Sequence, residues 1–208
     1  DHAIKKFAGD WIIHAAAYTD VDECEQHQDK ARSINIDGTA ALVTAAQKYD
    51  KKILFVSTDF IFDGTAPFYD EQSVPSPISF YGVTKYEGEK LVGAHAQNLI
   101  VRISFPYGKS ISGAKKDFVA TIRNQLTQGK NVVAPDDNLF TPTFIDDIAQ
   151  ALRVLITNSE SSIYHVIGSS TLSSYHAALA IAQTFHYQPD LVQPTKHRVY
   201  YENRAKRP

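Results

Sequence analysis

The sequence KKILFVSTD (residues 51–59) is followed, after a loop that contains Pro75 and Pro77, by YGVTK (residues 81–85). The apolar run in the first segment predicts a buried β-strand that ends at Ser-Thr-Asp, and the second segment predicts the beginning of a helix. On a helix, Tyr81 and Lys85 lie one turn apart on the same face. The two segments therefore predict that a strand-end hydroxyl, that of Thr58, lies near a Tyr–Lys pair.

The spacing of Tyr81 and Lys85 suggests proton-transfer chemistry. A free tyrosine has a pKa of about 10 and exchanges protons poorly near neutral pH unless a neighbouring cation favours the phenolate. Lys85 is placed to supply that cation, so the sequence predicts a lowered pKa for Tyr81, and Thr58 could hold a substrate oxygen against the phenol. The same spacing also arises by chance on exposed helices, so the prediction depends on the preceding strand and loop.

Strands and helices are expected to alternate along the chain. Short apolar runs predict strands at 11–13, 51–56, 99–103, 131–134 and 163–167. Longer segments with helical periodicity predict helices at 29–48, 81–96, 114–128, 144–157 and 173–186. This alternation is typical of βαβ crossovers and predicts an α/β fold with a parallel sheet.

The composition is that of an ordinary globular protein. The chain has 208 residues, 43% of them apolar, and a formal net charge of −2, which gives no electrostatic reason to bind nucleic acid or an anionic membrane. The basic residues between Lys196 and Arg207 suggest a solvated tail or, alternatively, a contact with a phosphorylated ligand. No apolar run approaches the roughly 18 residues of a membrane span, and no signal peptide is recognised.

Cysteine and histidine usage excludes two further classes of site. Cys24 is the only cysteine, so an internal disulfide is excluded and a reducing, cytoplasmic location is expected. The eight histidines never occur at i, i+4 or in His-x-His spacing, so no metal site is predicted.

Three segments resemble a known family: HAAAYTDVD (14–22), VSTDFIFDGT (56–65) and PSPISFYGVTK (75–85). They are similar to the extended short-chain dehydrogenase/reductases that act on nucleotide sugars, and within that family most similar to the dTDP-4-dehydrorhamnose reductases. The resemblance extends from about Asp10 to Pro208. It implies a doubly wound, Rossmann-like sheet and NADPH-dependent reduction of the 4-keto group of a dTDP-linked 6-deoxyhexulose, giving dTDP-rhamnose. NADH is the alternative cofactor, and a homodimer is expected.

The resemblance also implies roles for individual residues. Thr58, Tyr81 and Lys85 would be catalytic, and Thr58, Asp59 and Phe105 would contact the substrate. Cofactor binding would fall to Ala16, Ala17, Tyr18, Thr19, Asn35, Ser57, Tyr81 and Lys85. Three of these assignments have structural alternatives: the alanines also suit tight helix–sheet packing, Asn35 could be a buried structural amide instead of holding a water that relays protons to the lysine, and Asp59 could form a turn.

The glycine-rich phosphate loop of dinucleotide-binding folds is missing. The ten glycines never fall as Gly-x-Gly-x-x-Gly or Gly-x-x-Gly-x-x-Gly. The resemblance places that loop and three strands before Asp1, and its last matching segment continues beyond Pro208, so we expect an interior section of a longer enzyme. We assign 1–135 to the rest of a dinucleotide-binding domain, and 136–208 to a smaller substrate-binding lobe with a last sheet strand.

Two departures leave other functions open. Phe60 and Phe105 stand where the reductases usually carry tyrosine and tryptophan, so a different sugar is an alternative. A nucleotide-sugar epimerase or dehydratase would share Tyr81 and Lys85. The regulatory subunit of methionine adenosyltransferase has similar motifs but works by binding a partner enzyme. Thr143, before the helix expected at 144–157, is predicted to cap that helix, with substrate contact as the alternative.

Overall fold

The computed structural model describes residues 2–109, 117–158 and 160–208, and they form two compact units. Unit 1 comprises Asp1–Ile103, Leu152–Val166 and Arg204–Pro208, and unit 2 comprises Ser104–Ala151 and Ile167–Asn203. The chain thus passes between the units more than once. The functional division of the chain at residue 135 stays a prediction.

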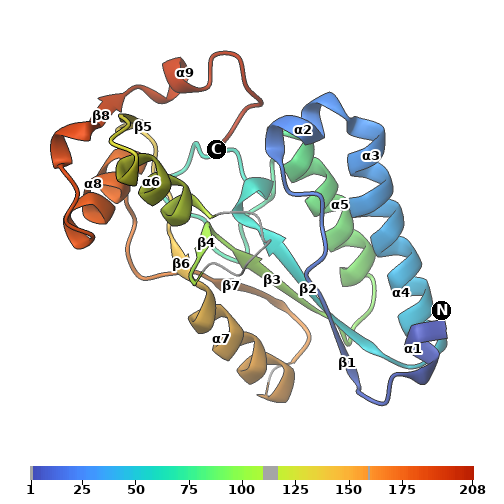
Figure 1. Cartoon of the computed structure of the whole chain (residues 1–208). Coiled ribbons are helices and arrows are strands. Elements are labelled where there is room, and N and C mark those ends of the chain that lie inside the picture. Colours follow the sequence, from blue (N-terminus) through green and yellow to red (C-terminus); the bar gives the residue numbers. More distant parts are fainter. Residues whose placement is uncertain (1, 110–116, 159) are drawn as a thin grey trace. The chain divides into compact units, whose positions relative to one another are not determined.

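Unit 1 is built on a four-stranded parallel sheet (Figure 1). Its strands, in spatial order, are β1 (Trp11–His14), β2 (Lys52–Thr58), β3 (Leu99–Ile103) and β7 (Ile163–Val166). All strand pairs are parallel, so their carboxyl ends meet at one edge of the sheet. Ligands of open α/β sheets bind outside that edge.

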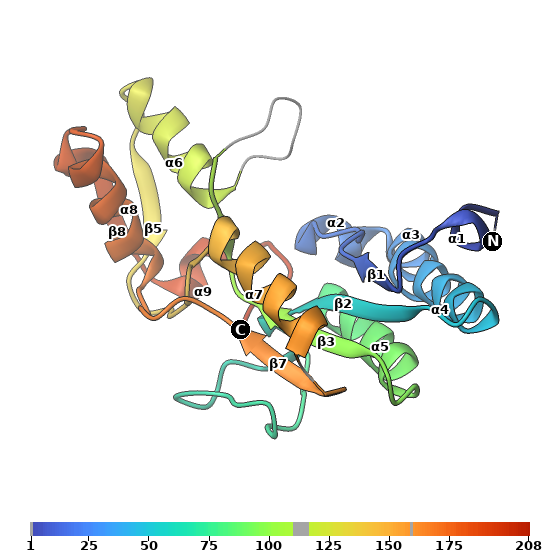
Figure 2. The same cartoon turned by 90° about the horizontal axis from the view of Figure 1, so that it is seen from below.

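Helices cover both faces of this sheet. On one face, α4 (Gly38–Lys48) and α5 (Phe80–Gly93) lie side by side (Figures 1 and 2) and pack with Phe55 of β2. On the other face, residues of α7 (Ile145–Asn158) pack against Leu54. The predicted α/β fold with a doubly wound parallel sheet is therefore confirmed.

The helix predicted at 29–48 contains a turn of another kind. It consists of α3 (Gln28–Arg32), a π-helical segment η1 (Ser33–Asp37) and α4. Single π turns inside helices are rare and occur frequently at functional sites. Asn35 lies in this turn and is buried. Unit 1 also contains α1 (His2–Lys6), α2 (Val21–Gln26) and the 3₁₀ turn η2 (Asp59–Ile61).

Unit 2 contains two short parallel strand pairs. They are β4 (Pro106–Tyr107) with β6 (Thr143–Phe144), and β5 (Val132–Pro135) with β8 (Val192–Thr195). Its core joins Leu126 of α6 (Phe118–Thr127), Val132, Val192 and alanines of α8 (Ser174–Thr184). The remaining elements are η3 (Pro189–Leu191) and α9 (His197–Tyr200). Residues 114–116 of the helix predicted at 114–128 lie outside the described residues.

The prediction that Thr143 caps the helix after it was wrong. Thr143 is in β6, and its buried hydroxyl donates to the carbonyl oxygen of Ser104 at 2.7 Å. It also accepts from the backbone N–H of Gly168 at 3.2 Å. The hydroxyl therefore joins neighbouring backbone segments of unit 2 rather than capping α7.

A buried ion pair joins α5 to the sheet. Arg102 of β3 and Glu89 of α5 are each 3% exposed, and the guanidinium donates to both carboxylate oxygens, at 3.1 and 2.8 Å. Arg102 also lies over the ring of Phe62, 5.3 Å from its centroid. This two-point geometry offsets the cost of burying the charges.

An Arg102→Met variant is expected to lower the free energy of unfolding by about 3 kcal/mol, because Glu89 would be left buried without its partner. The double variant Arg102→Met/Glu89→Met should recover most of the loss. Lys196→Met, which breaks the exposed pair with Asp136, is the control and should change stability by less than about 1 kcal/mol. Urea denaturation measures all three, and equal losses in the single and double variants would contradict this account.

Candidate active site

Thr58 and Tyr81 meet at the carboxyl edge of the unit 1 sheet. Thr58 is the last residue of β2 and accepts a hydrogen bond from the backbone N–H of Phe60 at 3.2 Å, which caps η2. Tyr81 lies in the first turn of α5, which begins after the capping hydroxyl of Ser79. The Tyr81 phenol lies close enough to the Thr58 hydroxyl for that hydroxyl to act on the pKa of Tyr81. The structure therefore brings this predicted pair together.

Glycine at position 82 allows this close approach. A β-carbon at Gly82 would overlap the carbonyl oxygen of Phe60 in η2. Further along α5, a β-carbon at Gly88 would lie 2.8 Å from the ring of Phe55. The two glycines let α5 pack directly on β2 and on the turn that follows it.

A Gly82→Ala variant is expected to move α5 away from η2, and Tyr81 with it. We expect a loss of about 1–3 kcal/mol in unfolding free energy and at least a tenfold loss of turnover, since small misplacements near reacting groups slow catalysis strongly. Gly38→Ala is the matched control, because its nearest atom would be 3.6 Å away and alanine favours a helix. Denaturation and kinetics on both variants test this, and an unaltered Gly82→Ala protein would contradict it.

Lys85 does not act on Tyr81 as the sequence predicted. Lys85 is 3% exposed, and its ammonium donates to the carbonyl oxygen of Val56 at 2.7 Å and lies 4.0 Å from the centroid of the Phe55 ring. Burial lowers the pKa of Lys85 to about 8, against the opposing effect of Glu89.

Burial raises the pKa of Tyr81, and the neighbouring Thr58 hydroxyl offsets this only in part. The predicted lowering of the Tyr81 pKa was therefore wrong, because the desolvation of the phenol outweighs the other effects. The buried phenol keeps its proton at neutral pH. It is thus equipped to donate a hydrogen bond or a proton to an oxygen placed beside Thr58.

The predicted cofactor residues after β1 lie in an irregular segment at the same edge of the sheet. Ala16 and Thr19 are exposed, and Ala17 and Tyr18 are half-buried. Asn35 fixes this segment, since its side chain accepts from the Tyr18 N–H at 2.7 Å and donates to the Tyr18 carbonyl oxygen at 3.0 Å.

Asn35 has a second fixed contact. The same side-chain amide donates to the hydroxyl of Thr84 on α5 at 2.9 Å, and that hydroxyl donates to the Tyr81 carbonyl oxygen at 2.8 Å. Asn35 therefore ties the segment after β1 to the helix that carries Tyr81. These contacts favour the structural alternative for its amide, and a part in a proton relay stays a prediction.

The other predicted residues differ in their surroundings. Ser57 is 2% exposed, and its hydroxyl oxygen has no hydrogen-bond partner among the described residues. Asp59 accepts a hydrogen bond from the Thr58 hydroxyl at 3.2 Å and begins η2, in agreement with a turn-forming role. Phe105 belongs to unit 2, where its ring packs against Phe118 and Phe140; substrate contact by Phe105 stays a prediction.

Part of a nicotinamide cofactor site fits these residues. Small side chains at Ala16 and Ala17 leave the backbone open to a ligand, and the Lys85 ammonium lies at the same strand end. In the part of the chain that the structure describes, the buried Ser57 hydroxyl has no hydrogen-bond partner. Within the described residues, no cluster of His, Cys, Asp or Glu could hold a metal ion. None of the helices that the structure describes is long and apolar enough to cross a membrane.

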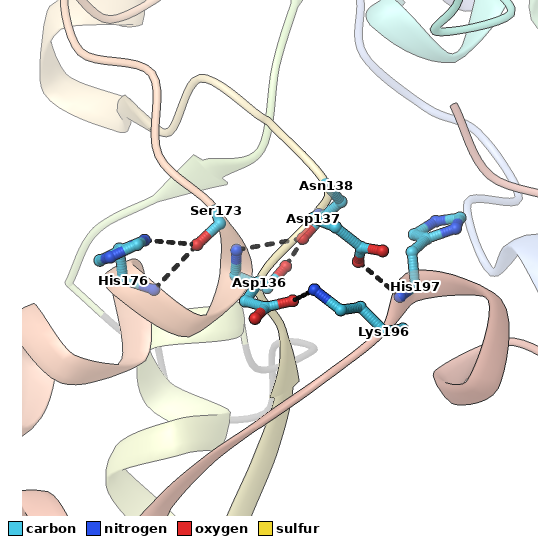
Figure 3. Close-up of polar contacts among 8 residues, drawn as sticks. Asp136, Asp137, Asn138, Ser173, His176, Lys196 and His197 are labelled. Atoms are coloured by element: carbon cyan, nitrogen blue, oxygen red, sulfur yellow. Dashed lines mark hydrogen bonds and ion pairs between the residues drawn. The ribbon is translucent and has the colours of Figure 1, made fainter.

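Unit 2 has a polar cluster that sequence analysis did not identify (Figure 3). At the carboxyl ends of β5 and β8, Asp136 pairs with Lys196 at 2.9 Å and Asp137 accepts from the His197 N–H at 2.6 Å. Asn138 bonds to Ser174 at the start of α8. Each of these polar groups has a partner within the protein, so these contacts fix the loop after β5.

The family model described as the RmlD substrate binding domain matches residues 1–208. The chain belongs to this family. Among its RmlD-family relatives are the dTDP-4-dehydrorhamnose reductase of Aggregatibacter actinomycetemcomitans, 34% identical over 86% of this chain, and methionine adenosyltransferase 2 subunit beta of Bos taurus, 31% identical over 93%. The chain spans 62% and 60% of the length of these two proteins.

Solved structures confirm the fold of this RmlD-family chain. The dTDP-4-dehydrorhamnose reductase of Bacillus anthracis, in complex with NADP, has a TM-score of 0.92 and 31% sequence identity. The match covers 100% of this chain and 72% of that one. A dTDP-glucose 4,6-dehydratase of Streptomyces venezuelae shares the fold with a TM-score of 0.83 and 20% identity.

Proposed function

We propose that the intact protein is an NADPH-dependent reductase that converts the 4-keto group of a dTDP-linked 6-deoxyhexulose to an alcohol, giving dTDP-rhamnose. The observation that supports this most is the placement of the Thr58 hydroxyl beside the Tyr81 phenol at the ligand-binding edge of the sheet. The similarity of the chain to dTDP-4-dehydrorhamnose reductases over 86% of its length agrees with it. A cytoplasmic location and a homodimer are further parts of the proposal that rest on the sequence.

In this mechanism, Thr58 and Tyr81 hold the substrate carbonyl oxygen between their hydroxyl groups. NADPH, when bound, supplies the hydride that the carbonyl carbon receives. Tyr81 transfers its phenolic proton to the oxygen as negative charge develops there, which balances the reduction. The single hydrogen of the Thr58 hydroxyl, which is donated to Asp59 in this structure, would turn to the substrate oxygen when the substrate binds.

Lys85 has an electrostatic role in the same scheme. Its ammonium, anchored on the Val56 carbonyl oxygen at 2.7 Å, would bind the nicotinamide ribose. Ala16, Ala17, Tyr18, Thr19 and Ser57 would form the remaining cofactor contacts in this chain. We propose NADPH rather than NADH as the cofactor because the structure of the Bacillus anthracis relative is a complex with NADP.

Turnover by the intact protein tests the proposal. Oxidation of NADPH should depend on dTDP-4-dehydrorhamnose, with dTDP-rhamnose as the product. A parallel reaction with NADH tests the cofactor preference. Absence of turnover with either cofactor would overturn the proposed activity.

The second candidate is a regulatory role without catalysis. The identity of 31% to methionine adenosyltransferase 2 subunit beta, over 93% of the chain, favours it. This role predicts a stable complex with a catalytic methionine adenosyltransferase and no turnover of the keto sugar. Size-exclusion chromatography of the two proteins together, run beside the turnover assay, distinguishes the candidates.

A further inference from the structure

The side chain of His14, at the carboxyl end of β1, is held in one protonation form. Thr39 of α4 has a single hydroxyl hydrogen, which it donates to the carbonyl oxygen of Asn35 at 2.7 Å. A carbonyl oxygen can only accept, so the direction of this bond is fixed. The Nε2 atom of His14 lies 2.9 Å from the Thr39 oxygen and must therefore be the donor. His14 thus carries its proton on Nε2, and Nδ1 presents a bare lone pair.

His14 is also neutral. It is 9% exposed, and burial together with the positive charge of Lys85 lowers the pKa of His14 to about 4. Within the described part of the chain, Nδ1 makes no hydrogen bond. Nδ1 is therefore open to accept a hydrogen bond from a ligand, a water or a nearby donor.

The Lys85 ammonium is a hydrogen-bond donor in the neighbourhood of His14. Both side chains contact the ring of Phe55. The centroids of the His14 and Phe55 rings are 5.3 Å apart, and the Lys85 nitrogen lies 4.0 Å from the Phe55 centroid. The ammonium has three N–H groups, of which one donates to Val56. The charged groups that act on this pair are Lys85 itself on His14 and Glu89 on Lys85, both from α5.

We propose that His14 is a positioning residue for Lys85: the ammonium donates to a water that in turn donates to Nδ1, and this bridge keeps Lys85 charged and oriented at the ligand-binding edge. The bond between Thr39 and Nε2 serves this arrangement, because it leaves Nδ1 as an acceptor. The consequence for catalysis rests on the proposed reductase function. The contact itself does not.

Two substitutions separate the roles of the nitrogens. In His14→Gln the side-chain amide nitrogen can replace Nε2 as the donor to Thr39, but no acceptor occupies the place of Nδ1. In His14→Asn the amide oxygen can occupy the place of Nδ1, but the contact with Thr39 is lost. The intact protein is labelled with isotopes in histidine and lysine, and NMR titration reports the His14 tautomer and the pKa of Lys85, assigned with Lys85→Arg.

We expect the Nε2–H tautomer in the wild type. His14→Gln should lower the pKa of Lys85 by about one unit, because loss of an acceptor disfavours the charged amine, while thermal stability is kept. His14→Asn should retain the Lys85 pKa but lose stability. In a protein that turns over the keto sugar, the alkaline limb of kcat should move to lower pH by the same amount in His14→Gln.

The Nδ1–H tautomer, or one Lys85 pKa shared by wild type and both variants, would overturn the proposal. A purely structural His14 would change stability in the variants and leave the Lys85 titration in place. The titration needs no substrate, so a protein without reductase activity would refute the proposed function while still testing the His14–Lys85 contact.

Discussion

A Tyr81→Phe variant of the intact protein is expected to lose reductase turnover by about 10³-fold while remaining folded. General acid catalysis by a positioned side chain contributes typically about 10²–10⁴-fold, and in the proposed mechanism the phenol beside Thr58 is the proton donor. The ring itself remains, so its edge contact with Phe60, 5.7 Å between centroids, is retained. The loss should appear in kcat, with little change in KM, because the phenolic proton acts mainly in the transition state.

The matched control for this prediction is Tyr86→Phe on the same helix. Tyr86 is half-exposed and its ring contacts Lys90, so removal of its hydroxyl should alter turnover by less than about twofold. Thr58→Val should lose activity and, because Thr58 also caps η2, some stability. Steady-state kinetics with NADPH and thermal denaturation are measured on all three, and near wild-type turnover in Tyr81→Phe would refute the mechanism.

The sequence was sufficient to predict the sheet because local patterns determine it. Residues 52–58 and 99–103 form apolar strands, and strands followed by helices have few alternatives to a parallel arrangement. The strand β8 was not predicted, since its sequence Val-Gln-Pro-Thr lacks a strand pattern and it pairs with β5, distant in the chain.

The candidate site shows a similar limit. Spacing alone predicted that Tyr81 and Lys85 share a helix and that Thr58 lies at the end of the preceding strand. The direction of the Tyr81 pKa depends on how deeply the phenol is buried, which no spacing reveals. The choice between two roles for Asn35 likewise needed its contacts with Tyr18 and Thr84.

A Lys85→Met variant is expected to lose at least 10²-fold in turnover and yet to have a larger free energy of unfolding than the wild type. Burial lowers the pKa of Lys85 from 10.5 to about 8, so the folded state disfavours the ammonium. At pH 7 both states are protonated and the folded protein bears this cost, on the order of 3 kcal/mol. Methionine fills the same space without charge, and after loss of the bond to Val56 a net gain of about 1–2 kcal/mol is expected.

The pH dependence identifies the cause of that gain. Between pH 8 and pH 10.5 the folded wild type has released the Lys85 proton while the unfolded chain still binds it, so wild-type stability rises with pH through this window. The advantage of Lys85→Met should therefore be greatest below pH 8 and shrink toward pH 10.5. Lys90→Met, at an exposed position on α5, should show neither effect. Urea denaturation across this range measures the difference, and a Lys85→Met protein less stable than wild type at pH 7 would show that the ammonium stabilises the fold.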